Sequence, residues 1–132
     1  MLTTISRTDF PYFERKLRER ALALRAEISA TLLRTDNEQY ARLAGEVHDM
    51  EEESVADLLV DVNLAEITRD VDELHDVEKA LDRIDRGTYG ECMRCKEPIA
   101  RERLEVYPTA KRCRPCQQAH DQARQVPPPP SL

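Results

Sequence analysis

Four cysteines in two close pairs constrain this chain more than any other feature of its sequence. The pairs are Cys92-Met93-Arg94-Cys95 and Cys113-Arg114-Pro115-Cys116, so the full spacing is C-x2-C-x17-C-x2-C. Each pair can present two sulfurs on one side of a tight turn, and two such turns complete a tetrahedron of thiolates. The spacing therefore predicts a structural Zn²⁺ site with no ligand position left for water. The predicted ligands are Cys92, Cys95, Cys113 and Cys116.

A redox dithiol is the alternative interpretation of the same cysteines. Such C-x-x-C pairs act in thioredoxin-like proteins, where they need a βαβ context that nothing in this sequence predicts. The chain has no uncharged apolar run of membrane-spanning length and no apolar stretch of signal-peptide length at its start, so we expect a cytoplasmic protein with no membrane association. In a reducing compartment, paired cysteines favour metal binding over disulfides.

Apolar residues recur in steps of three and four along two stretches that precede the cysteines. The first stripe runs from Phe13 to Val47 and the second from Val55 to Ile84. This spacing predicts two long amphipathic helices, and a short polar connection near residues 45–52 would place them antiparallel. We therefore expect a mainly α fold, with a long antiparallel coiled-coil hairpin on a small four-cysteine zinc-finger base.

The first stripe is interrupted between Leu32 and Leu43, where Thr35 and Gln39 take the apolar positions. The sequence Thr35-Asp36-Asn37-Glu38 could form a capping box and start a new helix. We expect the helix to continue through Thr35, and a break there is the alternative.

Changes in composition divide the chain into three segments. Residues 8–86 would form the hairpin, with an acidic tip near 46–54; residues 87–125 would form the zinc-finger base. Residues 126–132 are a Pro-rich tail, which fits either a solubilising terminus or a ligand for aromatic grooves. We expect the protein to be a monomer.

Charge is distributed unevenly between the tip and the base. Residues 46–66 contain eight acidic residues and no Lys or Arg, whereas residues 90–125 contain eight basic residues against five acidic ones. Acidic residues at a helix N-terminus are stabilising without any further function, but an acidic tip also suits a cationic or metal-containing partner site. The formal net charge of -6 makes direct binding to duplex DNA an unfavourable interpretation.

The region around the cysteines resembles the DksA/TraR family of bacterial transcription regulators. The likeness is closest in Gly87-Thr88-Tyr89-Gly90-Glu91-Cys92, in Pro98-Ile99 and in residues 103–117, and with the hairpin it extends over residues 9–122. The resemblance implies a non-enzymatic protein that binds RNA polymerase in its secondary channel and alters the lifetime of promoter complexes. Some members act together with ppGpp, the alarmone of the stringent response. The family usually has Gly where this chain has Lys96.

The resemblance also implies roles for particular residues. The family's tip pattern Asp-x-x-Asp-x-Ala matches Asp49-Met50-Glu51-Glu52-Glu53-Ser54, so Asp49 and Glu52 become effector carboxylates with Ser54 as their neighbour. Arg69 matches a basic residue of the alarmone or polymerase contact. Asp76 and Gln117 stand where the family has Lys, so we expect ppGpp to bind weakly or not at all.

Two other functions remain as alternatives at this stage. One is a nucleic-acid-binding zinc finger, in which Arg94, Lys96, Arg112 and Arg114 would contact phosphates. The other is a structural coiled-coil adaptor, for which substitutions at the tip would have no effect.

Overall fold

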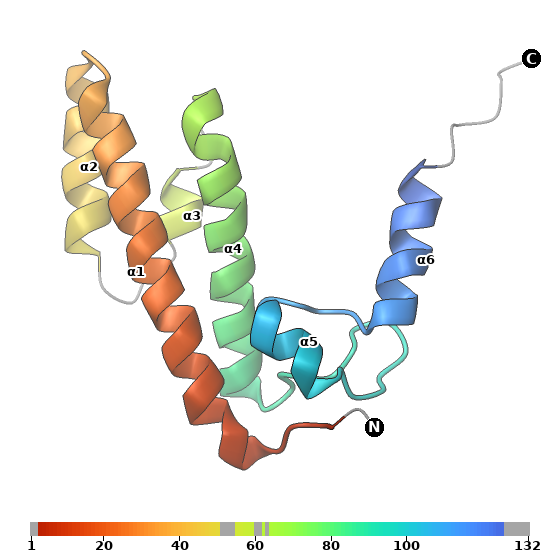
Figure 1. Ribbon diagram of the computed structural model, residues 1–132. Helices are drawn as coiled ribbons and strands as arrows, with labels where there is room; N and C mark the ends of the chain where they lie inside the picture. Colours follow the sequence, from red (N-terminus) through yellow and green to blue (C-terminus); the bar gives the residue numbers. More distant parts are fainter. Residues whose placement is uncertain (1–2, 51–54, 60–61, 63, 126–132) are drawn as a thin grey trace, which may run out of the picture.

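An arm of helices rises from a small base in this protein (Figure 1). The structure is a computed structural model that describes residues 3–50, 55–59, 62 and 64–125. Within these residues the elements are the 3-10 turn η1 (Arg7–Asp9) and the helices α1 (Phe10–Arg34), α2 (Glu38–Asp49), α3 (Val55–Leu58), α4 (Ala65–Arg86), α5 (Arg101–Val106) and α6 (Arg114–Gln125).

Helix α1 is the central element of the arm. Pro11 lies in its first turn, where a missing N–H costs no helical hydrogen bond. Its buried apolar side chains recur at helical spacing, and the helix packs against both α2 and α4. These side chains are Phe13, Leu17, Leu24, Ile28 and Leu32.

The antiparallel pair that the sequence predicts is formed by α1 and α4. The start of α1 and the end of α4 both lie at the base (Figure 1). Arg20 Nη2 of α1 donates to Glu73 Oε1 of α4 at 2.7 Å. The mainly α fold with a helical hairpin on a four-cysteine base is thus confirmed. The buried residues of α4 are Ile67, Leu74, Val77 and Ala80.

The prediction that the first helix continues through Thr35 is wrong. Thr35 is extended, with φ -79° and ψ 141°, and its hydroxyl donates to the Leu32 carbonyl at 2.6 Å. Asn37 then starts α2, because its side chain accepts a hydrogen bond from the Gln39 amide at 2.8 Å. The break lies inside the predicted capping box, with Asn37 rather than Thr35 as the cap.

Helix α2 folds back along α1. Ser29 Oγ donates to the Ala44 carbonyl at 3.2 Å, and Arg25 Nη2 donates to the Val47 carbonyl at 2.8 Å. Gly45 lies inside α2, which corrects the prediction of a connection that starts there. The turn between α1 and α2 is at residues 35–37.

The second apolar stripe is also divided between two helices. Helix α3 packs against α4, and its first amides, those of Val55 and Ala56, donate to the Glu78 carboxylate at 3.0 and 3.1 Å. Helix α4 starts only at Ala65 and ends as the sequence predicts, with Gly87 in the left-handed region at φ 77°. Periodicity identified the buried faces, but it did not show where each helix begins.

No helix within the described residues combines the length and the apolar character needed to cross a membrane.

Candidate functional site

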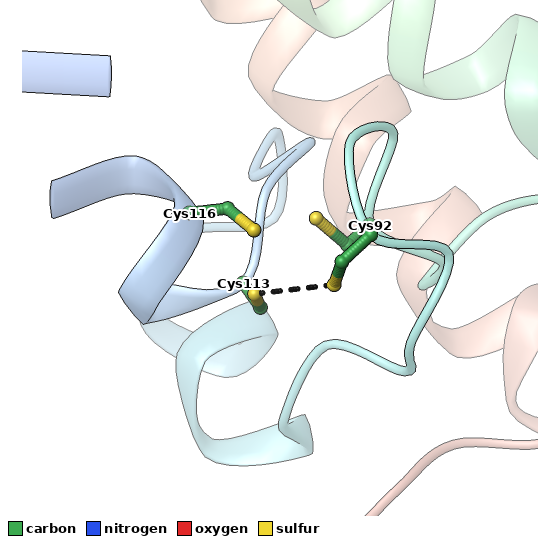
Figure 2. Close-up of side chains that lie close together, drawn as sticks. Cys92, Cys113 and Cys116 are labelled. Atoms are coloured by element: carbon green, nitrogen blue, oxygen red, sulfur yellow. Dashed lines mark hydrogen bonds between the residues drawn. The ribbon is translucent and has the colours of Figure 1, made fainter. Parts of the chain in front are cut away.

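The four cysteine sulfurs gather at one point of the base. All four lie within 4.8 Å of one another, and Cys95 Sγ is 3.7 Å from Cys113 Sγ. A zinc tetrathiolate with Zn–S bonds of about 2.3 Å has sulfurs about 3.8 Å apart. Figure 2 shows the sulfurs of Cys92, Cys113 and Cys116 pointing toward one another. The residues present therefore fit a closed structural Zn²⁺ site.

Backbone hydrogen bonds within the protein shape the first cysteine pair. The Cys92 amide donates to the Glu97 carbonyl at 2.9 Å, and the Lys96 amide donates back to the Cys92 carbonyl at 3.0 Å. The Met93 amide donates to the Lys111 carbonyl at 2.8 Å, which ties the first pair to the segment before the second pair. Two knuckles distant in sequence are thereby held face to face.

The thiols of this cluster have unequal proton affinities. Burial raises the pKa of the Cys92 thiol, but backbone N–H groups of Cys95, Cys113 and Arg94 outweigh it and lower the pKa to about 6. The hydrogen bond to Cys113, together with burial, raises the pKa of Cys116 to about 12. Four neighbouring thiolates repel one another, so a divalent cation is what permits all of them to ionise.

Lys96 adopts a backbone conformation that non-glycine residues avoid. Its φ is 67°, the single positive value among the non-glycine residues that the structure describes. This conformation turns the chain back after Cys95 and costs a residue with a Cβ about 1 kcal/mol or more. It gives a physical reason for a glycine at this position in the family that the sequence resembles.

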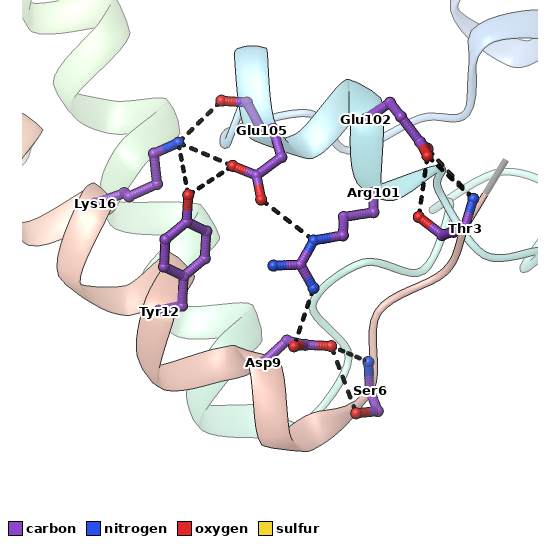
Figure 3. A network of polar contacts seen from close by, with 8 residues as sticks. All are labelled: Thr3, Ser6, Asp9, Tyr12, Lys16, Arg101, Glu102 and Glu105. Carbon is purple, nitrogen blue, oxygen red and sulfur yellow. Dashed lines mark hydrogen bonds and ion pairs between the residues drawn. The ribbon is translucent and has the colours of Figure 1, made fainter.

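A polar network joins α1 to the base, and no pattern in the sequence predicts it (Figure 3). Glu105 Oε2 of α5 accepts hydrogen bonds from Tyr12 Oη at 2.7 Å and from Lys16 Nζ at 3.2 Å. Glu105 Oε1 accepts from Arg101 Nε at 3.2 Å, and Arg101 Nη1 lies 3.0 Å from Asp9 Oδ1. The hydrogen bond from Tyr12 and the charges of Lys16 and Arg101 lower the pKa of Glu105. Desolvation acts in the opposite direction but does not cancel this shift.

The N-terminal segment completes the base. The Thr3 amide and hydroxyl donate to the Glu102 carboxylate, and the Arg101 amide donates to the Thr3 carbonyl at 2.7 Å. Ile5 packs on Gly90, whose φ is 86° and where an added Cβ would lie 2.8 Å from Ile5 Cδ1. This segment is too short for its spacing to show a pattern, so only the folded structure reveals these contacts.

The predicted effector residues are only partly described. Asp49 is exposed and is the last residue of α2. Because α2 folds back along α1 after the turn at residues 35–37, Asp49 lies at the end of α2 that is far from this turn. Glu52 and Ser54 lie outside the described residues. The grouping of the three tip residues therefore stays a prediction.

The positions matched to an alarmone site lie on two elements. Arg69 is exposed on α4. Asp76, about two turns further along α4, lines a groove of about 650 Å³ with Lys16 and Arg20 of α1. Gln117 lies on α6, where its side-chain amide donates to Asp121 at 2.9 Å.

Comparisons with known proteins agree with this architecture. Residues 87–122 match the family described as the prokaryotic dksA/traR C4-type zinc finger. An uncharacterized protein from Aquifex aeolicus (strain VF5) is 42% identical over 43 residues, which are 33% of this chain and 30% of that protein. The transcription factor DksA2 from Pseudomonas aeruginosa has a similar structure, with a TM-score of 0.60 and 26% identity, over 90% of this chain and 88% of that one.

Proposed function

This chain belongs to the DksA/TraR family of zinc-finger transcription factors, and we propose that it regulates transcription by binding bacterial RNA polymerase in the secondary channel. The observation that carries the proposal is the combination of the family's zinc finger with a fold similar to that of DksA2 over nearly the whole chain. In this proposal the zinc is structural, the protein performs no chemical reaction, and it acts as a monomer in the cytoplasm.

The base and the arm have different tasks in this proposal. The base supplies binding area, because the described exposed apolar side chains include Val106 and Tyr107. Asp49 and Glu52 supply negative charge near the polymerase active centre, with Ser54 beside them. Charges interact more strongly where a channel excludes water, so two carboxylates can have a large local effect.

In vitro transcription tests this proposal. Adding the zinc-loaded protein to polymerase on a stable-RNA promoter should change the lifetime of the promoter complex. The variants Asp49→Asn and Glu52→Gln should compete for the secondary channel as the parent does and yet lose most of this effect. Asp49 is exposed at the C-terminal end of α2, where the helix dipole does not favour a carboxylate, so Asp49→Asn should change the stability little. Full activity of both variants, with binding to the polymerase unchanged, would remove these carboxylates from the mechanism and favour a structural adaptor.

Binding of ppGpp should be weak in the complex with polymerase. Asp76 places a carboxylate where a phosphate would need a cation, and Gln117 supplies no charge. Titration of the complex with ppGpp should show little added response, and Asp76→Lys should increase it. A strong response of the parent protein would mean that Arg69 and other groups build the site differently.

A nucleic-acid-binding zinc finger remains the second candidate, because Arg94, Lys96 and Arg114 are exposed on the base. Such a protein would bind duplex DNA of any sequence, with an affinity that falls steeply as the salt concentration rises. Under the polymerase proposal, such affinity should be negligible at physiological ionic strength, since the net charge is -6.

A further inference from the structure

A groove of about 650 Å³ lies between α1, α4 and the end of α5 with the residues after it. Leu17 of α1 and Val77 of α4 line the groove and are buried, so its floor is apolar. Val106 and Tyr107 line it from the base and are 84% and 46% exposed. Apolar side chains that stay exposed along a groove are typical of a site that a partner or ligand covers.

The basic side chains of this groove are already paired. Lys16 Nζ lies 3.2 Å from Glu105 Oε2 and donates to the Glu105 carbonyl at 3.0 Å (Figure 3). Arg20 Nη2 donates to Glu73 Oε1 at 2.7 Å. Each basic residue that lines the groove thus has its own carboxylate, so an anionic ligand would have to compete with both pairs.

Asp76 of α4 carries the remaining charge of the groove lining. It is half-buried, and among the residues that the structure describes none forms a hydrogen bond or an ion pair with it. Arg83, about two turns further along α4, interacts with this charge through space, but its hydrogen bond goes to the Thr109 carbonyl at 3.5 Å. The groove therefore presents one carboxylate that a cation can reach without breaking an existing pair.

We propose that this groove binds an arginine side chain of a protein partner, with the guanidinium at Asp76 and the aliphatic carbons against Leu17 and Val77. A guanidinium is always charged and weakly hydrated, so it suits a carboxylate that has apolar neighbours. Its parallel N–H groups can donate to both oxygens of Asp76. Tyr107 supplies an aromatic ring in the same groove, and a cation is favoured there as well.

This inference rests on the proposed function, in which the partner is RNA polymerase, and it adds the chemistry of one contact. The groove lies beside α5, where the arm meets the base (Figure 1). Both parts of the molecule line it, so an arginine bound there would fix the orientation of both on the polymerase. Asp76 then has a function of its own, beyond disfavouring a phosphate.

Two arginine analogues test the groove on the full-length, zinc-loaded protein alone. N-acetyl-arginine amide carries the guanidinium, whereas N-acetyl-citrulline amide has nearly the same shape without the charge. NMR titration at low ionic strength, up to about 20 mM because so small a ligand binds weakly, should shift the methyl signals of Leu17 and Val77 with the arginine amide. The citrulline amide should shift them several-fold less. Asp76→Asn should abolish the difference. Asp72→Asn removes an exposed carboxylate of α4 outside the groove and should keep it.

Polymerase binding tests the same carboxylate in the complex. Asp76→Asn should weaken the binding of the zinc-loaded protein about tenfold, because it leaves the partner's guanidinium without its counter-charge. Asp72→Asn should leave binding within about twofold of the parent, since charges on exposed surfaces contribute little. Zinc content and melting temperature of both variants should stay near those of the parent, because Asp76 has no ion pair to lose within the described residues.

Unchanged or tighter polymerase binding by Asp76→Asn would overturn the inference, and so would equal shifts with the two amides. Failure of the proposed function is distinguishable from these results. If the parent protein does not bind polymerase, the proposed function is wrong, whereas the titration with the two amides still decides whether the groove binds a guanidinium.

Discussion

The base and the outer arm are held in different ways. In the base, four sulfurs, a buried Tyr89 and the segment from Thr3 to Asp9 converge on a small region. In the outer arm, α2 and α3 are attached by apolar faces and by hydrogen bonds to α1 and α4. The base thus depends on specific residues in a fixed geometry, and the outer arm depends mainly on the burial of apolar faces.

This difference should show most strongly when a zinc ligand is removed. Cys92→Ser should unfold the base and release the metal, because a structural zinc site supplies several kcal/mol of folding free energy. The arm should keep much of its helix, since its own apolar core lies along α1 and α4. Zinc content and hydrogen exchange of residues 87–125 measure this.

The control for this change is Met93→Ser, which alters an exposed neighbour in the same knuckle. It should keep both zinc and the protection of the base from hydrogen exchange. An ordered base in Cys92→Ser without zinc would show that hydrogen bonds alone hold the fold.

The same contrast explains what the sequence could predict. The zinc ligands were predictable because thiol chemistry and C-x2-C spacing leave few alternatives, and the end of α4 was predictable from Gly87. The break at Thr35 was not predictable in the same way, because apolar residues at steps of three and four on both sides of it fit one helix as well as two helices that pack together. Apolar periodicity specifies a face and not the partner.

Contacts between distant residues were beyond sequence reasoning altogether. Glu78 accepts hydrogen bonds from the first amides of α3, which lie 23 and 22 positions earlier in the chain. Glu105 joins α5 to Tyr12 and Lys16 of α1. A surface Glu in a helical pattern gives no local signal of either role.

A second prediction concerns the close approach in the base. Gly90→Ala should lower the free energy of unfolding of the base by about 1–3 kcal/mol, because Ala is strained at positive φ and its Cβ would meet Ile5. Thermal unfolding of the zinc-loaded protein measures the loss. The double variant Ile5→Ala with Gly90→Ala removes the close contact and keeps the backbone strain. If it regains none of the lost stability, backbone strain alone causes the loss. An unchanged melting temperature for Gly90→Ala would contradict both causes.

A third prediction makes the opposite change, from a side chain to glycine, just after the first cysteine pair. Lys96→Gly should stabilise the base by about 1 kcal/mol, because glycine adopts the φ of 67° without a Cβ penalty. Thermal unfolding of the zinc-loaded protein again measures the change. The control is Lys96→Ala, which removes the charge and keeps the strain. Equal stability of the two variants would mean that the knuckle relaxes around residue 96.

The smallest effect is expected in the arm, at Gly45. This glycine lies inside α2, and an added Cβ would meet nothing within 4 Å. Gly45→Ala should therefore stabilise the arm by about 0.5–1 kcal/mol through helix propensity. Because Gly45 is exposed and the added methyl group carries no charge, the change should leave the effect on transcription nearly unaltered. Hydrogen exchange of residues 38–49 should slow while zinc affinity stays constant. A large change in transcription would show that the surface around position 45 itself contacts the polymerase.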